Sequence, residues 1–210
     1  MKKLLLIAGF LYSTSALFAQ NVEVTPLFGY TFCDGFETYY GSYDVKGSML
    51  YGARLDVEIA DLSYFELSVR RNDPTISYLS AGDNASRDFS SGVAHYMVGY
   101  LREFQAGAIK PYGVFSAGTS RYWVKEQEGV DENYNKWFFS TELGLGAKMF
   151  ISDMIGVRLQ ASVTTPWDFA GGGLYMGVGG GGAGAGGAMT FGIPVGHWDL
   201  SAGLIIRLKN

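Results

Sequence analysis

Residues 45–59 read VKGSMLYGARLDVEI and alternate between two kinds of side chain along their whole length. One set consists of Val45, Gly47, Met49, Tyr51, Ala53, Leu55, Val57 and Ile59, and the other of Lys46, Ser48, Leu50, Gly52, Arg54, Asp56 and Glu58. Successive side chains of a β-strand point to opposite faces, so the pattern predicts one strand with an apolar face and a largely polar face. At roughly 3.3 Å per residue this strand would be about 50 Å long, well beyond the usual strand of a soluble sheet.

The same period of two recurs along the chain. It predicts seven further strands, at residues 22–32, 64–70, 92–104, 109–124, 137–151, 155–163 and 199–208. The strands at 92–104 and 109–124 alternate too weakly for their faces to be assigned. Pro26 favours an early position in its strand over a central one, because proline cannot donate a hydrogen bond to a neighbouring strand.

The connections between these strands alternate in length. They are short at 60–61, 103–108 and 152–154, and long before residue 45 and at 72–89, 125–133 and 167–197. Short periplasmic turns and long external loops are typical of outer-membrane barrels, and a closed barrel leaves no backbone group unpaired in lipid. Aromatic side chains expected to form an interfacial girdle are Tyr51, Trp137, Phe139, Trp167 and Trp198. We therefore expect an all-β fold, a single eight-stranded antiparallel up-and-down transmembrane β-barrel.

The composition excludes several other classes of protein. The 14 Tyr, 14 Phe, 4 Trp and 30 Gly, with a mean hydropathy of +0.09, fit neither a helical membrane protein nor a disordered chain. A net charge of −4 and the lack of a basic stripe argue against nucleic acid as a partner. Cys33 is the single cysteine, so the fold contains no intramolecular disulfide.

The first residues predict export. Lys2 and Lys3 precede an apolar run from Leu4 to Leu11, and small residues follow up to Ala19. This order is that of a secretory signal peptide, so we expect residues 1–19 to be removed and residues 20–210 to form one barrel domain in the bacterial outer membrane.

The end of the chain resembles the C-terminal assembly signal of outer-membrane barrels. The residues that carry the resemblance are Ser201, Gly203 two positions later, Ile206 and Leu208. That signal usually ends on an aromatic residue, whereas here Leu208 is followed by Lys209 and Asn210. Through its strand rhythm and this terminus, nearly the whole mature chain resembles the OmpA-like or OmpX-like small outer-membrane β-barrels. The resemblance implies outer-membrane lipid and the barrel-assembly machinery as partners.

The charged faces of the strands are the first candidates for a site. If they line the lumen, they bring together a polar network of Arg54, Asp56, Glu66, Arg70, Glu142, Lys148, Arg158 and Arg207, with Glu23, Lys46 and Glu58 beside it. Side chains fill the interior of an eight-stranded barrel, so we expect a salt-bridged plug with Arg54, Glu66, Glu142 and Arg158 at its centre. The alternative is a pathway for ions or small solutes, because charges at membrane depth often mark one.

Catalysis and cofactor binding have little support. His95 and His197 are not followed by a serine in a His-x-Ser arrangement, and two histidines with one distant cysteine give no metal-ligand spacing. The glycine-rich residues 170–187 lack the Lys-Ser/Thr pair of a phosphate loop and predict a flexible external loop or an additional hairpin. No catalytic residue, metal or cofactor is therefore expected.

The expected role is structural or concerns surface interaction, such as adhesion, with an extracellular partner bound through the long loops. A narrow channel is one alternative. A lipid-modifying enzyme is another, because eight-stranded outer-membrane barrels include lipid A deacylases and palmitoyl transferases. A soluble lipocalin-like barrel is the alternative fold, and it would place the apolar faces inside around an apolar ligand.

Overall fold

The computed structural model describes residues 21–33, 36–38, 41–80, 86–105, 107–124, 135–167 and 197–208. Its strands are β1 (Val22–Cys33), β2 (Phe36–Thr38), β3 (Gly41–Val45), β4 (Ser48–Ala60), β5 (Ser63–Asn72), β6 (Thr75–Ser80), β7 (Ser86–Glu103), β8 (Ile109–Val124), β9 (Asn135–Phe150), β10 (Ile155–Trp167) and β11 (His197–Leu208). The expected signal peptide and the glycine-rich residues 170–187 lie outside the described residues. Within the described ranges, no helix is long and apolar enough to cross a membrane.

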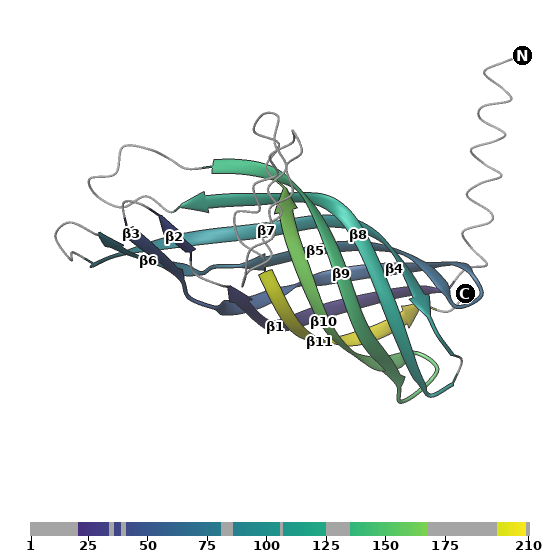
Figure 1. Ribbon diagram of the computed structural model, residues 1–210. Coiled ribbons are helices and arrows are strands. Elements are labelled where there is room, and N and C mark those ends of the chain that lie inside the picture. Colours follow the sequence, from purple (N-terminus) through teal and green to yellow (C-terminus); the bar gives the residue numbers. More distant parts are fainter. Residues whose placement is uncertain are drawn as a thin grey trace, which may run out of the picture.

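Eight of these strands close into a barrel (Figure 1). Around the ring they follow the order β1, β4, β5, β7, β8, β9, β10 and β11, and every neighbouring pair is antiparallel. The first and last strands pair from Val22↔Leu208 to Cys33↔His197, which closes the ring. The predicted eight-stranded antiparallel barrel is confirmed.

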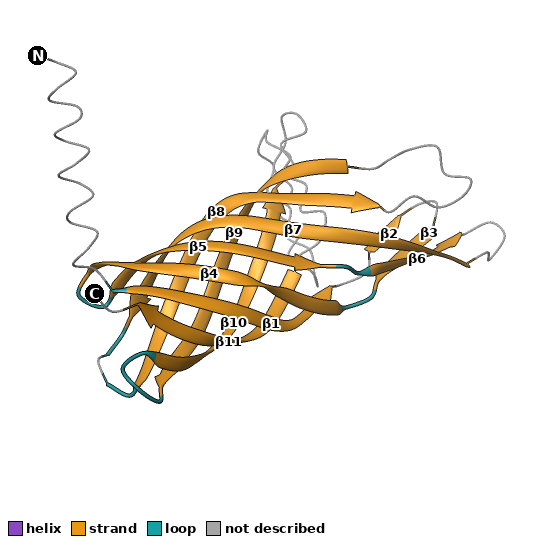
Figure 2. Cartoon of the chain, turned by 180° about the vertical axis from the view of Figure 1, so that it is seen from behind, coloured by secondary structure: helices purple, strands orange, loops and turns teal. Residues whose placement is uncertain are grey.

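The remaining strands extend the wall beyond the barrel. β2, β3 and β6 pair in that order with one another and then with the beginning of β7, and Figure 2 shows them past the rim. The predicted strand at 45–59 is confirmed from Ser48 onward, but its start is wrong, because the chain changes partner at Lys46 and Gly47. Val45 ends β3 opposite Ile76 of β6, whereas β4 pairs with β1 and β5. The predicted long connection at 72–89 likewise contains β6 and the start of β7.

The short connections lie at the end of the barrel where β1 begins and β11 ends. The backbone NH of Glu58, near the β4–β5 turn, bonds to the carbonyl of Asn21 at 3.0 Å, and that of Arg207 bonds to Met154 of the β9–β10 turn at 2.8 Å. The other end carries the long connections and the additional strands. This arrangement matches the alternation of connection lengths in the sequence.

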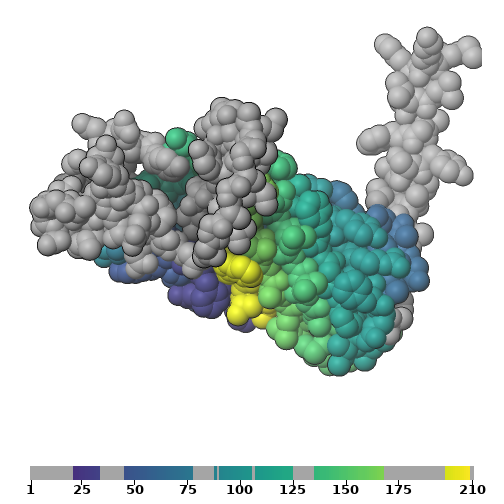
Figure 3. Space-filling model, in the orientation of Figure 1, coloured from purple at the N-terminus to yellow at the C-terminus, as the bar shows by residue number. Residues whose placement is uncertain are grey.

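Apolar side chains cover the outside of the barrel and charged ones fill it. Phe28 is 64% exposed and Leu145 67%, whereas Arg54 is 2% and Glu66 0% exposed. Figure 3 shows the continuous outer surface of the wall from β8 in teal to β11 in yellow. A soluble barrel has the reverse distribution, so the lipocalin-like alternative is contradicted.

Pro26 is the fifth of the twelve residues of β1, in the first half of a strand that has a neighbour on both sides. β1 pairs with β4 through Pro26↔Ala53 without a break. Its ladder with β11 runs through Val24↔Ile206 and resumes at Leu27↔Gly203. The barrel accommodates the proline with a local interruption of one ladder, as expected of a residue that has no NH to donate.

Candidate functional site: the charged lumen

Twelve charged side chains, from all eight barrel strands, meet inside the barrel and form linked ion pairs. The cations are Arg54, Arg70, Lys110, Lys148, Arg158 and Arg207, and the carboxylates are Glu23, Asp56, Glu66, Glu103, Glu142 and Asp199. The side chains of Lys110 and Arg207 are 16% and 18% exposed, and the other ten are 2% exposed or less. Six positive and six negative groups make this lumen network formally neutral.

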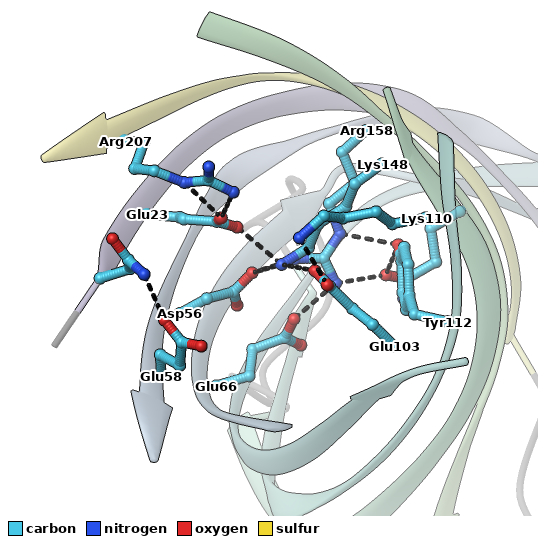
Figure 4. Close-up of polar contacts among 12 residues, drawn as sticks. Glu23, Asp56, Glu58, Glu66, Glu103, Lys110, Tyr112, Lys148, Arg158 and Arg207 are labelled. Carbon is cyan, nitrogen blue, oxygen red and sulfur yellow. Dashed lines mark hydrogen bonds and ion pairs between the residues drawn. The ribbon is translucent and has the colours of Figure 1, made fainter. Parts of the chain in front are cut away.

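The layer nearest the short turns is centred on Lys148 (Figure 4). Its Nζ lies 2.7 Å from Glu23 and 2.9 Å from Asp56, and it sits 4.2 Å from the centre of the Tyr64 ring. Arg207 donates from Nη2 to the same Glu23 at 2.7 Å. Glu23 of the first strand therefore binds one cation of β9 and one of the last strand, β11.

The middle layer is centred on Arg158, whose guanidinium has four polar partners. It donates to Asp56 at 3.0 Å, to Glu66 at 2.5 Å, to the Tyr112 hydroxyl at 2.7 Å and to Gln160 at 2.8 Å. These bonds use all three guanidinium nitrogens, so the buried cation is well satisfied.

The layer towards the long loops is centred on Arg70. It donates to Asp199 at 2.6 Å and to Glu142 at 2.6 Å. Glu142 also lies 3.7 Å from Arg54 and accepts a hydrogen bond from Gln160 at 3.1 Å, which connects this layer to the middle one. The three layers therefore form one continuous network along the barrel axis.

The structure brings together the eight lumen residues expected from the sequence. Arg54, Asp56, Glu66, Arg70, Glu142, Lys148, Arg158 and Arg207 all lie in the network, and Arg54 contacts both Glu66 and Glu142 at 3.7 Å. Lys46 does not join them: its side chain is 55% exposed and faces Asp88 in the external sheet at 3.7 Å. Glu58 instead accepts a hydrogen bond from Asn21.

Sequence reasoning missed four members of the site. They are Glu103, Lys110, Tyr112 and Asp199. The first three lie on β7 and β8, where buried apolar residues such as Val93, Met97, Leu101 and Val114 share the inner face and hide the alternation. Asp199 lies on the polar face of the last predicted strand, so the alternation of that strand could have assigned it to the lumen.

Two histidines lie next to the Arg70 layer. His95 Nδ1 is 2.6 Å from Ser120 Oγ, and His197 Nε2 is 2.8 Å from the Tyr122 hydroxyl. The serine was missed because it lies 25 residues from its histidine and reaches it through the pairing of β7 with β8. Ser120 is 0% and His95 1% exposed, so a substrate carbonyl has no open path to this pair. Among the described residues, no group of three or more His, Cys, Asp or Glu side chains is arranged to hold a metal ion.

The residues of the expected assembly signal divide between the two faces of β11. Ser201 is 8% exposed and, like Gly203, faces the lumen. Ile206 and Leu208 are 39% and 53% exposed on the outer face. Leu208 is the last residue of the strand and pairs with Val22 at the short-turn end.

The aromatic residues expected to form a girdle lie on the outer face towards the long loops. Tyr51, Trp137, Phe139 and Trp198 are between 43% and 58% exposed. Trp167 is partly buried and donates from its indole to Thr141 at 2.9 Å. The exposed apolar band therefore ends in a row of aromatic side chains, as membrane barrels require at the interface.

Comparison with protein-family models and with curated proteins finds no match for this sequence. Three solved structures have the same fold, and the first is outer membrane protein OprG from Pseudomonas aeruginosa, with a TM-score of 0.57, 12% identity and coverage of 91% of this chain and 97% of that chain. The second is Ail, the attachment invasion locus protein of Yersinia pestis, in complex with the heparin analogue sucrose octasulfate, with a TM-score of 0.51, 12% identity and coverage of 89% of this chain and 99% of that chain. The third is Neisserial surface protein A, with a TM-score of 0.50, 13% identity and coverage of 90% of this chain and 97% of that chain. At these identities the likeness concerns the fold.

Three observations converge on one class of protein. The barrel is closed by eight strands, its outer surface is an apolar band bounded by aromatic residues, and its interior is charged. Only a lipid environment makes this distribution favourable, and the similar structures are bacterial outer-membrane barrels. This chain is a bacterial outer-membrane β-barrel with the small OmpA-like and OmpX-like fold.

Proposed function

We propose that the protein serves a structural or surface-interaction role in the outer membrane, with a salt-bridged plug in its lumen and its external strands and loops as the binding surface. The observation that carries the proposal is the lumen network. Six cations and six carboxylates fill the barrel axis, and ten of the twelve side chains are 2% exposed or less. A neutral, desolvated network of this kind supports a closed barrel rather than a solute pathway.

The external sheet supports the second half of the proposal. β2, β3 and β6 continue the wall from the start of β7 beyond the rim, so the proposed binding surface is built on paired strands. Ail, which shares this fold, was solved with a heparin analogue. A sulfated glycan is therefore the first external ligand to test.

Conductance across a planar lipid bilayer tests the plug. We expect the unaltered protein to give no steady current steps. Glu142→Gln should give frequent steps, because Arg54 and Arg70 both lose a counter-charge and the network loosens. The control is Lys46→Gln, which changes an exposed charge outside the lumen. A steady, ion-selective current through the unaltered protein would instead establish the narrow channel.

Binding of fluorescent heparin to vesicles that contain the protein tests the external surface. The informative variant replaces residues 34–47 and 73–90 with short turns, which removes β2, β3, β6 and the start of β7 but leaves the eight barrel strands. We expect the full chain to bind and the trimmed chain to lose binding. Both proteins must first show the mobility shift on boiling that marks a folded barrel. Equal binding by both, or by neither, contradicts a glycan site on this sheet.

Export and assembly complete the proposal. Residues 1–19 would direct export, and residues 20–210 would form the barrel domain. Ser201, Gly203, Ile206 and Leu208 would present the assembly signal, because the last two are exposed at the short-turn end of the final strand. Leu208→Ser should lower the amount of heat-modifiable protein in outer membranes more than Leu143→Ser, which also alters an exposed leucine of the wall. Equal losses would assign both effects to the apolar band alone.

A further inference from the structure

We propose that the outer wall carries a binding site for the phosphate of a lipid headgroup in the outer leaflet, formed by Arg71 and Arg121 around Trp123. The two arginines come from β5 and β8, which flank β7 in the sheet (Figure 2). They belong to the outer face of the barrel and take no part in the lumen network. The site is therefore separate from the plug and from the external sheet.

Strand register places the site in one row across the wall. Tyr51 pairs with Arg71, Arg71 with Ala94, and Ala94 with Arg121, which in turn pairs with Trp137. The two arginines are thus separated by a single alanine, at about 10 Å between their backbones for strands spaced about 4.8 Å apart. Ala94 is only 6% exposed although it belongs to the outer face, because larger neighbours cover it.

The two guanidinium groups converge on one indole ring. The Cζ of Arg71 lies 5.0 Å and that of Arg121 5.3 Å from the centre of the Trp123 ring. Trp123 leans over Gly92, where an added Cβ would come within 2.3 Å of the indole. Together with Tyr51 and Tyr96 these side chains line a hollow of about 500 Å³. The hollow has room for a headgroup phosphate beside the two cations.

Among the residues that the structure describes, the charges in this hollow are unbalanced. Arg71 donates to Asp73 at 2.9 and 3.3 Å, and the Tyr51 hydroxyl also donates to Asp73. Arg121 donates to Asn135 at 3.0 Å, and this acceptor is neutral. Two cations and the one carboxylate that the structure pairs with them leave a positive charge near the membrane boundary. A phosphate supplies the missing negative charge and matches the planar donors of arginine.

The height of the site on the wall selects a lipid as the source of the phosphate. On β7 the outward residues below Ala94 are Tyr96, Val98 and Tyr100, and the next is Arg102. The step from Ala94 to Arg102 is eight residues along β7. At a rise of roughly 3.3 Å per residue, on strands tilted by about 40° from the membrane normal, it spans a height of about 20 Å, close to that of the apolar band of a membrane barrel. Arg71 and Arg121 therefore lie at the outer edge of this band and Arg102 at the inner edge. Headgroup phosphates lie at the outer edge, with acyl chains along the apolar residues below it.

Lipid retention measured by native mass spectrometry tests the site in the full chain. The probes are phosphorylated lipid A and the same lipid without its phosphates, each added to protein extracted in a mild detergent. We expect the double variant Arg71→Gln/Arg121→Gln to retain at least about tenfold less phosphorylated lipid than the unaltered protein, because two charge-assisted contacts are lost. Retention of the dephosphorylated lipid should be low for both. Arg102→Gln should retain phosphorylated lipid like the unaltered protein.

Three outcomes would overturn the proposal. They are equal retention of phosphorylated lipid by the double variant and the unaltered protein, equal retention of the two lipids by the unaltered protein, and displacement of the lipid by millimolar inorganic phosphate. Sucrose octasulfate is added as a competitor, and loss of its binding in the double variant with lipid retention intact would assign the arginines to a soluble polyanion. Each variant must show the mobility shift on boiling, so a folding defect is recognised separately.

Discussion

A buried cation in this barrel contributes to stability in a different way from an exposed one. Arg70 is 0% exposed and bridges Glu142 and Asp199, so Arg70→Met leaves two carboxylates in the lumen without this partner. We expect a loss of about 3–5 kcal/mol in the free energy of unfolding. Lys46→Met removes one member of an exposed pair and should cost less than about 1 kcal/mol.

The measurement is urea unfolding in lipid vesicles, followed by tryptophan fluorescence. Similar shifts of the midpoint for the two variants would contradict the network as a source of stability. A small shift for both would indicate that water in the lumen replaces the lost partner.

Hydroxyl groups give a second contrast between the inside and the outside of the wall. Tyr112 is 1% exposed, and its hydroxyl accepts from Arg158 at 2.7 Å and contacts Gln160 at 2.8 Å. Tyr112→Phe should therefore cost about 1–3 kcal/mol, because a buried donor loses its acceptor. Tyr100→Phe changes a side chain that is 48% exposed and should cost less than about 1 kcal/mol. Urea midpoints of the two variants in the same vesicles measure both losses of stability. A larger loss for Tyr100→Phe would contradict the role assigned to the buried Tyr112 hydroxyl.

The part of the site that could be predicted depends on how regularly polar and apolar residues alternate along each strand. Arg54, Glu66 and Glu142 were found because their strands alternate cleanly, and parity alone assigns their face. Glu103 and Lys110 were missed because apolar residues also occupy the inner faces of β7 and β8. The pairing of His95 with Ser120 depends on strand register, which the sequence of one strand does not contain.

Single glycines decide how closely neighbouring strands approach. On β8, a Cβ at Gly118 would lie 2.1 Å from the carbonyl oxygen of Tyr96, a backbone atom that cannot turn away. At Gly113 the nearest atom is the end of the Phe104 ring at 3.2 Å, and that side chain is 63% exposed and free to move. We expect Gly118→Ala to cost about 1–3 kcal/mol. Gly113→Ala should stay within about 0.5 kcal/mol.

The same urea assay, together with the fraction of protein that refolds to the heat-modifiable form, compares these two variants of one strand. Equal stability of both would show that the β7–β8 pair adjusts its spacing without cost. That result would remove the steric role assigned to Gly118.

Elements inside the membrane were easier to predict than those outside it. Lipid on one side and a polar lumen on the other enforce the period of two, so the eight barrel strands could be located from sequence. β2, β3 and β6 lie beyond the barrel rim, where neither face meets lipid, and their sequence carries no comparable constraint. The alternation at 45–59 continues through Lys46 and Gly47 although the chain changes partner there, because parity does not report which strand lies alongside.

At the scale of the whole molecule, strand order and side-chain distribution specify the direction of insertion. Both termini of the barrel and all its short turns lie at one end, and the external sheet lies at the other. An exported chain reaches the outer membrane from the periplasm, so the end with the short turns stays on that side. The long loops and the external sheet then face the medium, where the proposed binding surface must be.

Cysteine labelling in intact cells checks this orientation. In a Cys33→Ser background, Asp88→Cys places a thiol on the external sheet, at a side chain that is 58% exposed, and Asp153→Cys places one in the β9–β10 turn. A membrane-impermeant maleimide should label the first variant on intact cells and the second only after the outer membrane is permeabilised. Permeabilised cells of both variants show that each thiol is reactive. The reverse pattern would put the external sheet in the periplasm and remove the basis for a surface-binding role, because no external ligand would then reach β2, β3 and β6.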